Sequence, residues 1–167
     1  MKRLLMLLVA AALGAAAATI TVAAARTDGA SLHQTTITVV LKNRDYRVVD
    51  LPPAGESHGD IRVGNAQLYN ASETQRVGSF HIFCSLTDPA DRPGEDAQVT
   101  ECMFTYSLPG GDITTQGITR RASLGDVAEA DVDAVTGGTG RYQTARGEVH
   151  LLPSQGDRRR IVLRLIL

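Results

Sequence analysis

Only a few residues of this sequence have the types and spacing that chemistry needs, and none of them completes a known catalytic motif. The run Ser57-His58-Gly59-Asp60 contains the residue types of a hydrolase triad, but sequence neighbours do not form such a relay and the motif G-x-S-x-G is absent. The run Gly137-Gly138-Thr139-Gly140 lacks the Gly-Lys-Ser/Thr of a phosphate-binding loop. Its glycines instead predict a tight turn with positive φ. The sequence therefore predicts neither a hydrolase nor a nucleotide cofactor.

Other ionisable side chains admit both a functional and a structural interpretation. The four histidines are scattered, without the close pairing that metal ligands show, so no metal and no other cofactor is predicted. Glu129, Asp131 and Asp133 alternate onto one face of an expected strand, where they form either a cation site or, as we favour, a solvated rim. Arg158–Arg160 predict a charged turn, with capture of an acidic group at the mouth of a barrel as the alternative.

The two cysteines, Cys84 and Cys102, are spaced symmetrically about residue 93, within the turn signal Pro93-Gly94. In an antiparallel hairpin with that turn, opposed residues keep a constant index sum, so the two cysteines face each other. At a non-hydrogen-bonded position, this pair is close enough for a disulfide bridge. We favour the bridge, which would contribute about 3 kcal/mol to stability; a reactive free thiol is the alternative.

The N-terminal segment has the three parts of a secretory signal peptide. Met1-Lys2-Arg3 is a short positive region, residues 4–22 are almost wholly apolar, and Ala23-Ala24-Ala25 offers a cleavage site. We predict removal of residues 1–25 and secretion to the periplasm or the cell exterior, with an uncleaved membrane anchor as the alternative. No later apolar run reaches membrane length, so no membrane contact is expected after cleavage.

Residues 26–167 are predicted to form one all-β domain. The chain of 167 residues has a formal net charge of −1, without the basic excess that is typical of nucleic-acid binding. Runs rich in Val, Ile, Thr, Tyr and Phe alternate with Gly, Pro, Asn and Asp, and segment 121–128 has room for one helical turn. Eight short strands at near-regular spacing predict a closed barrel or a sandwich. The predicted strands are His33–Leu41, Asp60–Tyr69, Arg76–Leu86, Gln98–Ser107, Ile113–Arg120, Glu129–Val135, Tyr142–Leu152 and Arg160–Leu167.

The last predicted strand is apolar on both faces. Ile161 and Leu163 lie on one face, and Val162 and Ile166 lie on the other. Both faces are therefore expected to be covered. In a barrel, the lumen covers one face and a partner subunit covers the other; a central sandwich strand is the alternative. The breakers Pro153–Gly156 predict the turn that precedes this strand.

Several short motifs occur in the order and spacing of a known superfamily. They are Gly59-Asp60, Leu68-Tyr69-Asn70, Thr115-Gln116-Gly117, Gly137–Tyr142 and Ala145-Arg146-Gly147. Together they resemble the "GD…LYD", "VQG" and "GGTG(K/R)F…ARG" motifs of the allene oxide cyclase and dirigent barrels, over roughly residues 33–167. This resemblance implies an eight-stranded antiparallel β-barrel, commonly a homotrimer, with an apolar lumen open at one end that takes a small hydrophobic molecule.

The chain departs from the plant cyclases where their polar groups lie. The first predicted strand has no carboxylate in Gln34–Leu41, and Ala66 stands where the cyclases have an asparagine that holds a water. Cys84 matches their lumen cysteine, but a bridge to Cys102 would remove it as a free thiol. The plant reaction is therefore not predicted. Arg146 matches the arginine of the dirigent "ARG" motif.

The sequence favours a secreted barrel that binds a small hydrophobic ligand and steers its cyclisation or stereoselective coupling. Whether it is an enzyme stays open; as an enzyme it would be an isomerase or cyclase that acts by conformational control. The alternative is a non-catalytic structural or interaction barrel with a filled lumen. A lumen cavity of about 300 Å³ or more would favour the first function. The expected lumen positions are Arg62, Gly64, Ala66, Phe83 or Cys84, and Tyr106, with Arg146 near the mouth.

Overall fold

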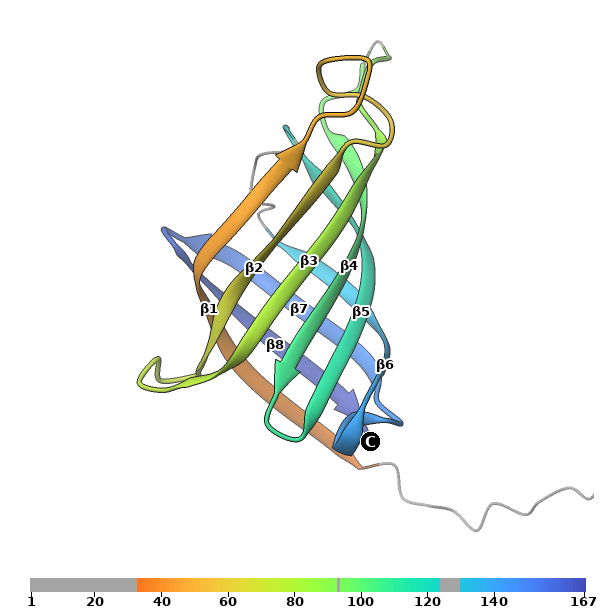
Figure 1. Cartoon of the computed structure of the whole chain (residues 1–167). Helices are drawn as coiled ribbons and strands as arrows, with labels where there is room; N and C mark the ends of the chain where they lie inside the picture. Colours follow the sequence, from red (N-terminus) through yellow and green to blue (C-terminus); the bar gives the residue numbers. More distant parts are fainter. Residues whose placement is uncertain (1–32, 93, 124–129) are drawn as a thin grey trace, which may run out of the picture. The chain divides into compact units, whose positions relative to one another are not determined.

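The computed structural model describes residues 33–92, 94–123 and 130–167. Within these ranges, eight antiparallel strands close into one barrel in sequence order, from β1 next to β2 round to β8 next to β1 (Figure 1). The strands are β1 (Gln34–Val49), β2 (Ile61–Asn70), β3 (Arg76–Asp88), β4 (Gln98–Leu108), β5 (Gly111–Arg121), β6 (Asp131–Gly138), β7 (Arg146–Gln155) and β8 (Arg158–Ile166). The predicted barrel is confirmed. The predicted signal peptide and residues 124–128 of the predicted helical turn lie outside the described residues.

The pairing of β1 with β8 decides between a barrel and a sandwich. Val39 lies opposite Ile161 in this pair, and β1 also pairs with β2 on its other side. Because every described strand has two neighbours, the sheet has no free edge. Side chains therefore alternate between a lumen and an outer surface along each strand.

Strand β1 is longer than predicted, because it continues through a bulge. The polar residues after Leu41 suggest that the strand ends there, but the chain stays paired with β2 as far as Val49. The register shifts between Lys42 and Asp45, and Asn43 takes a positive φ of 53°. The extra residue switches the inward-facing side from odd to even positions. Tyr46 is therefore brought to the lumen side, against Gly64 and Arg62 of β2.

Strand β7 starts later than predicted and tolerates a proline. Gly140–Tyr142 form a short 3-10 helix, η1, and Tyr142 is buried. Gly140 takes a φ of 57°, and a Cβ there would overlap with the carbonyl oxygen of Gly110. Pro153, predicted to lie in a turn, lies inside β7 where the register with β8 shifts between Leu151 and Ser154. A bulge accommodates proline because the residue there has no ladder hydrogen bond to lose.

The lumen is divided into an apolar end and a polar end. The apolar end is packed with buried side chains such as Leu68, Ile113 and Leu165, and η1 lies beside β5 and β6 at this end (Figure 1). The polar end is where β1, β3, β5 and β7 finish and β2, β4, β6 and β8 begin. There Asp60, before β2, accepts hydrogen bonds from the backbone N–H groups of Leu51 and Ser57, both at 2.8 Å. These bonds lower the pKa of the Asp60 carboxyl and fasten the loop between β1 and β2.

Candidate functional site

Buried polar and charged side chains gather inside the polar end of the barrel. Each comes from a strand position that alternation turns inward, so the closed sheet brings together residues that are distant in sequence. Such a group is unusual, because small barrels commonly fill their interior with apolar side chains. The inward polar residues are Tyr46 of β1, Arg62 of β2, Tyr106 of β4, Thr115, Thr119 and Arg121 of β5, Asp131 and Asp133 of β6, and Arg159 of β8.

A small cavity lies between six of these nine groups, whereas Tyr106, Thr115 and Asp133 do not line it. Its volume is about 30 Å³, which is room for one or two water molecules. It is smaller than the roughly 300 Å³ that a drug-sized ligand needs. Apolar side chains from β1, β3, β4 and β7 line it together with the charged ones. The described lining residues are Leu41, Arg44, Tyr46, Arg62, Phe80, Ile82, Phe104, Thr119, Arg121, Asp131, Leu151 and Arg159.

Two of the arginines are held by groups on neighbouring strands. The Arg159 side chain donates hydrogen bonds from Nε to the Leu152 carbonyl at 2.8 Å and from a terminal nitrogen to the Leu151 carbonyl at 3.3 Å. Both carbonyls lie at the bulge beside Pro153, where the β7–β8 ladder is interrupted. The Arg62 guanidinium lies 4.9 Å from the centre of the Tyr46 ring, in cation–π geometry. The bulges in β1 and β7 therefore help to place the cationic groups.

Asp133 is the most unusual member of the cluster. Its side chain is 1% exposed, and neither carboxylate oxygen has a hydrogen-bond partner among the described residues. The pKa of the Asp133 carboxyl is raised to about 7, chiefly by burial and next by the nearby Asp131 carboxylate, while Arg159 acts in the opposite direction. Burial likewise raises the pKa of Asp131. Asp133 can therefore give up or take a proton near neutral pH, as general acids and bases do.

Gly117 provides the space that the Asp133 carboxylate occupies. A Cβ at position 117 would overlap with Oδ1 of Asp133. The glycine of the Thr115-Gln116-Gly117 motif therefore lies beneath the carboxylate, on the strand that pairs with β6. The sequence motif has a structural reason in this contact, because only glycine leaves room for the buried acid.

We expect Gly117→Ala to destabilise the protein by about 1–3 kcal/mol, the usual cost of overpacking a well-packed site. The same substitution in an Asp133→Ala background should cost much less, because the overlapping carboxylate is gone. Urea unfolding of the four proteins gives the coupling energy between the two positions. An equal cost of Gly117→Ala in both backgrounds would contradict the assigned contact.

Tyr106 forms part of an aromatic floor beneath the charged groups. Its side chain is fully buried, and no hydrogen bond of standard geometry reaches its hydroxyl from the described part of the chain, although the Thr115 side chain lies near enough to act on its pKa, which it lowers. The ring centre lies 5.1 Å from that of Phe80, which lies 5.4 Å from that of Phe104. Burial, and next the Asp133 carboxylate, raise the pKa of Tyr106 well above its ordinary value. The hydroxyl is therefore protonated across the physiological range and can donate a hydrogen bond.

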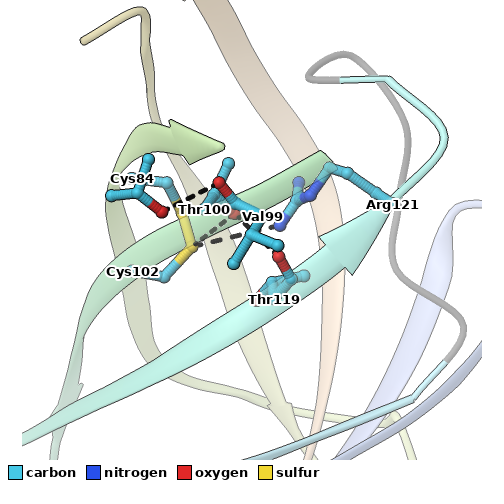
Figure 2. Close-up of a disulfide and its surroundings, with 7 residues drawn as sticks. Cys84, Val99, Thr100, Cys102, Thr119 and Arg121 are labelled. Atoms are coloured by element: carbon cyan, nitrogen blue, oxygen red, sulfur yellow. Dashed lines mark hydrogen bonds between the residues drawn. A yellow bond between two sulfur atoms is a disulfide. The ribbon is translucent and has the colours of Figure 1, made fainter. Parts of the chain in front are cut away.

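A disulfide bridges β3 and β4 inside the lumen. Cys84 pairs with Cys102 at a Cα–Cα distance of 4.1 Å, so the predicted bridge is confirmed. Figure 2 shows Thr100, Thr119 and Arg121 around it. Thr100 Oγ1 donates to the Thr119 carbonyl at 3.3 Å, and a terminal nitrogen of Arg121 lies 4.0 Å from Cys102 Sγ. Because both cysteines are bridged, neither is available as a nucleophile.

The comparisons with known proteins identify this architecture. A scan against protein-family models and a search of curated proteins returned no match. Among solved structures, a pyocyanin demethylase is 26% identical, with 78% of this chain and 99% of that chain covered and a TM-score of 0.64. AbnU, an exo-specific intermolecular Diels-Alderase, is 14% identical, with 80% and 98% covered and a TM-score of 0.60. The pterocarpan synthase dirigent protein GePTS1 is 13% identical, with 80% and 83% covered and a TM-score of 0.55.

The chain has the allene oxide cyclase/dirigent-like barrel fold. In this dirigent-like barrel, three of the predicted lumen residues lie at different depths. Arg62 lines the cavity and is 4% exposed. Gly64 lies under Tyr46, where a Cβ would overlap with the Asp45 carbonyl oxygen and the Tyr46 ring. Ala66 lies deeper, in the apolar core.

The remaining predicted positions are settled by which face of the barrel each residue occupies. Tyr106 and Cys84 point inward, whereas Phe83 is 41% exposed on the outer surface. Arg146 is exposed at the start of β7, at the apolar end of the barrel, and donates to the Ala145 carbonyl at 2.8 Å. Arg146, which the sequence predicts near the mouth of the lumen, therefore lies at the opposite end of the barrel from the polar cluster. The arginine of the Ala145-Arg146-Gly147 motif therefore forms its hydrogen bond with the adjacent backbone.

Sequence reasoning missed much of the polar cluster of this dirigent-like barrel. Asp131 and Asp133 were expected on a solvated rim, but they face the lumen, and Asp133 is buried. Of the three consecutive arginines, Arg159 points inward and its two neighbours are exposed. Arg121 is the last residue of β5, one position beyond the end of the predicted strand Ile113–Arg120. Thr119 and Arg121 lie two residues apart on one strand, as do Asp133 and Val135, so the members of each pair share a face. This period of two is the signal from which their inward position could have been predicted.

The described residues offer no site for a metal and no membrane-spanning helix. No three His, Cys, Asp or Glu side chains in residues 33–92, 94–123 and 130–167 lie close enough together to hold a metal ion. Over the same ranges, no helix is long and apolar enough to cross a membrane.

Proposed function

We propose that this barrel binds a small hydrophobic molecule in the polar end of its lumen and steers its cyclisation or stereoselective coupling. One observation carries the proposal: the Tyr106 hydroxyl and the Asp133 carboxylate are buried without hydrogen-bond partners in the described residues. Each buried polar group left in this state costs about 1–3 kcal/mol. A barrel that served only as a filled scaffold would gain stability by replacing them with apolar side chains. Buried groups of this kind are instead common at functional sites.

The structural neighbours support the same function class. AbnU is an exo-specific intermolecular Diels-Alderase, another solved neighbour is a cyclase that catalyses a [4 + 2] cycloaddition, and GePTS1 is a pterocarpan synthase dirigent protein. The pyocyanin demethylase also acts on a small molecule. In this chain, the aromatic floor of Phe80, Phe104 and Tyr106 would hold an apolar ligand in one conformation. Holding reacting atoms in one arrangement lowers the entropic part of a barrier without a covalent step.

The polar side chains would then orient the ligand and exchange protons with it. The Tyr106 hydroxyl is a buried donor for a ligand oxygen, and Asp133 is a proton donor or acceptor near neutral pH. Arg62 and Arg159 supply positive charge in a site of low dielectric, where charge stabilises a polar transition state strongly. The corresponding enzyme class is an isomerase or cyclase.

A filled structural barrel is the second candidate, and the small cavity favours it. A volume of about 30 Å³ does not accommodate an organic ligand. Ligand entry therefore requires the long side chains that line the cavity, such as Arg44, Arg121 and Tyr46, to swing aside. Arginine side chains have the rotamer freedom for this movement. The two candidates thus differ in whether the polar end opens.

Tryptophan reporters distinguish these candidates, because the natural chain contains no tryptophan. Phe104→Trp places a reporter at the cavity, and Val132→Trp places the control on the outer face of β6. Titration with the apolar dye N-phenylnaphthylamine should quench the first reporter by more than about half at saturation and leave the second nearly unchanged. Equal quenching of both, or of neither, would contradict a lumen site.

We also propose that the protein is secreted and forms a homotrimer. The lumen disulfide is typical of an oxidising compartment. Phe83, Met103 and Ile118 are exposed on the outer face of adjacent strands β3, β4 and β5, which is an apolar surface suited to a subunit interface. Native mass spectrometry of the protein purified from its own host would report the subunit count, any retained small molecule and the mass after signal removal. A full-length monomer would contradict this proposal.

A further inference from the structure

A second pocket opens at the apolar end of the barrel, opposite the polar cluster. It lies between the beginnings of β1 and β3, the ends of β2 and β4, and the short helix η1. Its volume is about 260 Å³, which is close to the roughly 300 Å³ of the smallest ligand sites and far above that of the polar cavity. The described lining residues are Ile37, Thr38, Val39, Asn70, Val77, Leu108, Pro109, Arg141 and Tyr142.

The walls of this pocket are apolar, and they stay accessible after the barrel has closed. Ile37, Val77 and Leu108 pack against the core but are only partly buried. The two most buried lining residues, Val39 and Tyr142, are 2% and 3% exposed and form the floor. Partly exposed apolar groups in a concave site gain free energy when a ligand removes them from water. The pocket therefore favours a ligand with an apolar body.

Two polar side chains of the pocket wall are already bonded to the protein. The Tyr142 hydroxyl donates to the Pro109 carbonyl at 3.3 Å. The Asn70 side chain closes the turn between β2 and β3, where its Nδ2 donates to Thr74 Oγ1 at 3.0 Å and its Oδ1 accepts from the Thr74 N–H at 2.9 Å. Because these bonds commit both side chains to the surrounding loops, a strongly polar molecule would gain little from the pocket.

Arg141 is the one charged side chain among the described residues that line this pocket. Its guanidinium lies 5.5 Å from the centre of the Tyr142 ring. Its methylene groups lie over Gly110, where a Cβ would overlap with them, and its backbone N–H donates to the Gly110 carbonyl at 2.9 Å. None of the ion pairs in the described part of the chain includes Arg141. The rim of the pocket therefore presents a cation that is held in position and available to an anion.

We infer that this pocket is a second binding site and that it takes a small amphipathic carboxylate. The ligand class is a medium-chain alkyl acid or a single-ring aromatic acid, whose body contacts Ile37, Val77 and Leu108 and whose carboxylate lies at Arg141. The planar donor array of an arginine matches a carboxylate in shape and charge. The pocket volume equals about nine water molecules at roughly 30 Å³ each, so the apolar body has room for about eight carbon atoms.

This second site is independent of the function proposed for the polar end. The two cavities share no described lining residue. Between them lies the packed part of the lumen, which includes Leu68 and Ile113. A ligand at the apolar end therefore neither needs nor blocks the polar cavity.

Octanoate and octan-1-ol test the inference on the whole protein, because they share one alkyl body and differ in charge. In NMR titrations, both should shift the amide signals of Ile37, Val77 and Leu108. The amide signal of Phe104, at the polar cavity, should stay unchanged. Octanoate should bind about two- to fivefold more tightly than octanol, the range expected for an exposed ion pair. Because Arg141 is exposed, high salt should remove this preference.

Matched arginine variants locate the carboxylate. Arg141→Gln should lower the affinity for octanoate to that for octanol and leave the affinity for octanol unchanged. Arg146→Gln is the control, because Arg146 is a second exposed arginine at the same end, donates to the Ala145 carbonyl and does not line the pocket. This control should bind both ligands as the wild type does. Since both arginines are exposed, neither substitution should unfold the barrel.

Three outcomes would overturn the inference. Equal affinity for octanoate and octanol, or an equal loss of affinity in both arginine variants, would remove Arg141 as the carboxylate partner. Unchanged amide signals of Ile37, Val77 and Leu108 with either ligand would remove the site itself. Shifts of these signals on dilution of the protein alone would show that a second copy of the chain covers the pocket instead. All three leave the function of the polar end intact, since the Phe104→Trp reporter tests that function separately.

Discussion

Asp133→Asn is expected to stabilise the protein at neutral and alkaline pH, with a gain that grows to about 4 kcal/mol between about pH 4 and pH 7 and then stays level. The wild-type carboxyl has its pKa raised from 3.8 to about 7, chiefly by burial. The folded state therefore binds this proton more tightly than the unfolded state does. As the pH rises from the unfolded pKa to the folded pKa, the wild-type protein loses stability, because an ionised carboxylate must stay buried. Asparagine does not ionise and escapes this loss.

Urea unfolding of both proteins at a series of pH values measures this effect. The free energy of unfolding of the variant, relative to wild type, should rise through the window from about pH 4 to about pH 7 and then level off. Asp157→Asn, in the exposed turn between β7 and β8, is the matched control and should leave the curve parallel to wild type. A difference between Asp133→Asn and wild type that does not vary with pH would contradict a buried, proton-binding Asp133.

Removal of the lumen disulfide is the second change with a large expected effect. Cys84 and Cys102 are separated by 18 residues, and closing a loop of this size stabilises a protein by about 3 kcal/mol through the unfolded state. The double variant Cys84→Ala and Cys102→Ala should lose that amount, plus a smaller cost for the cavity left by two fully buried side chains. Thermal or urea unfolding without reductant measures the loss.

Reduction of the wild-type protein provides the control for this variant. A thiol reductant should lower the unfolding midpoint of wild type toward that of the double variant, and it should leave the variant unchanged. A double variant as stable as the oxidised wild type would contradict a stabilising bridge. The two predictions also differ in sign: the disulfide stabilises the polar end of the lumen, whereas Asp133 destabilises it.

This opposition has a consequence for function. The polar end contains a covalent crosslink, two strand bulges that place side chains, and a glycine that makes room for a buried acid. These features hold the polar side chains of the lumen in place, where they would otherwise separate or become hydrated. Proteins accept destabilising groups of this kind where activity depends on them. The stability gain of Asp133→Asn should therefore accompany a loss of the activity proposed for the polar end of the lumen.

Local patterns along the chain were enough to predict the strands and the bridge. Alternating apolar residues and the turn residues between them gave eight strands, because side chains on neighbouring positions point to opposite faces. The Cys84–Cys102 pair followed from the centre of one hairpin, since β3 and β4 keep a constant index sum through most of their register. The resemblance to dirigent barrels added the closed topology. These are short-range or pairwise properties, which a sequence carries directly.

The composition of the lumen depended on contacts that a sequence does not carry. Tyr46 reaches the cavity only because a bulge at Asn43 shifts the inward side of β1. Arg159 binds carbonyls that the bulge at Pro153 leaves open on β7. A shift of one residue exchanges the two faces of a strand, so bulges decide which side chains meet inside. The sequence by itself determined the strands, the hairpin and the disulfide; the closed tertiary structure decided that Asp133, Tyr106 and the arginines share one buried site, because only closure turns distant charged residues inward together.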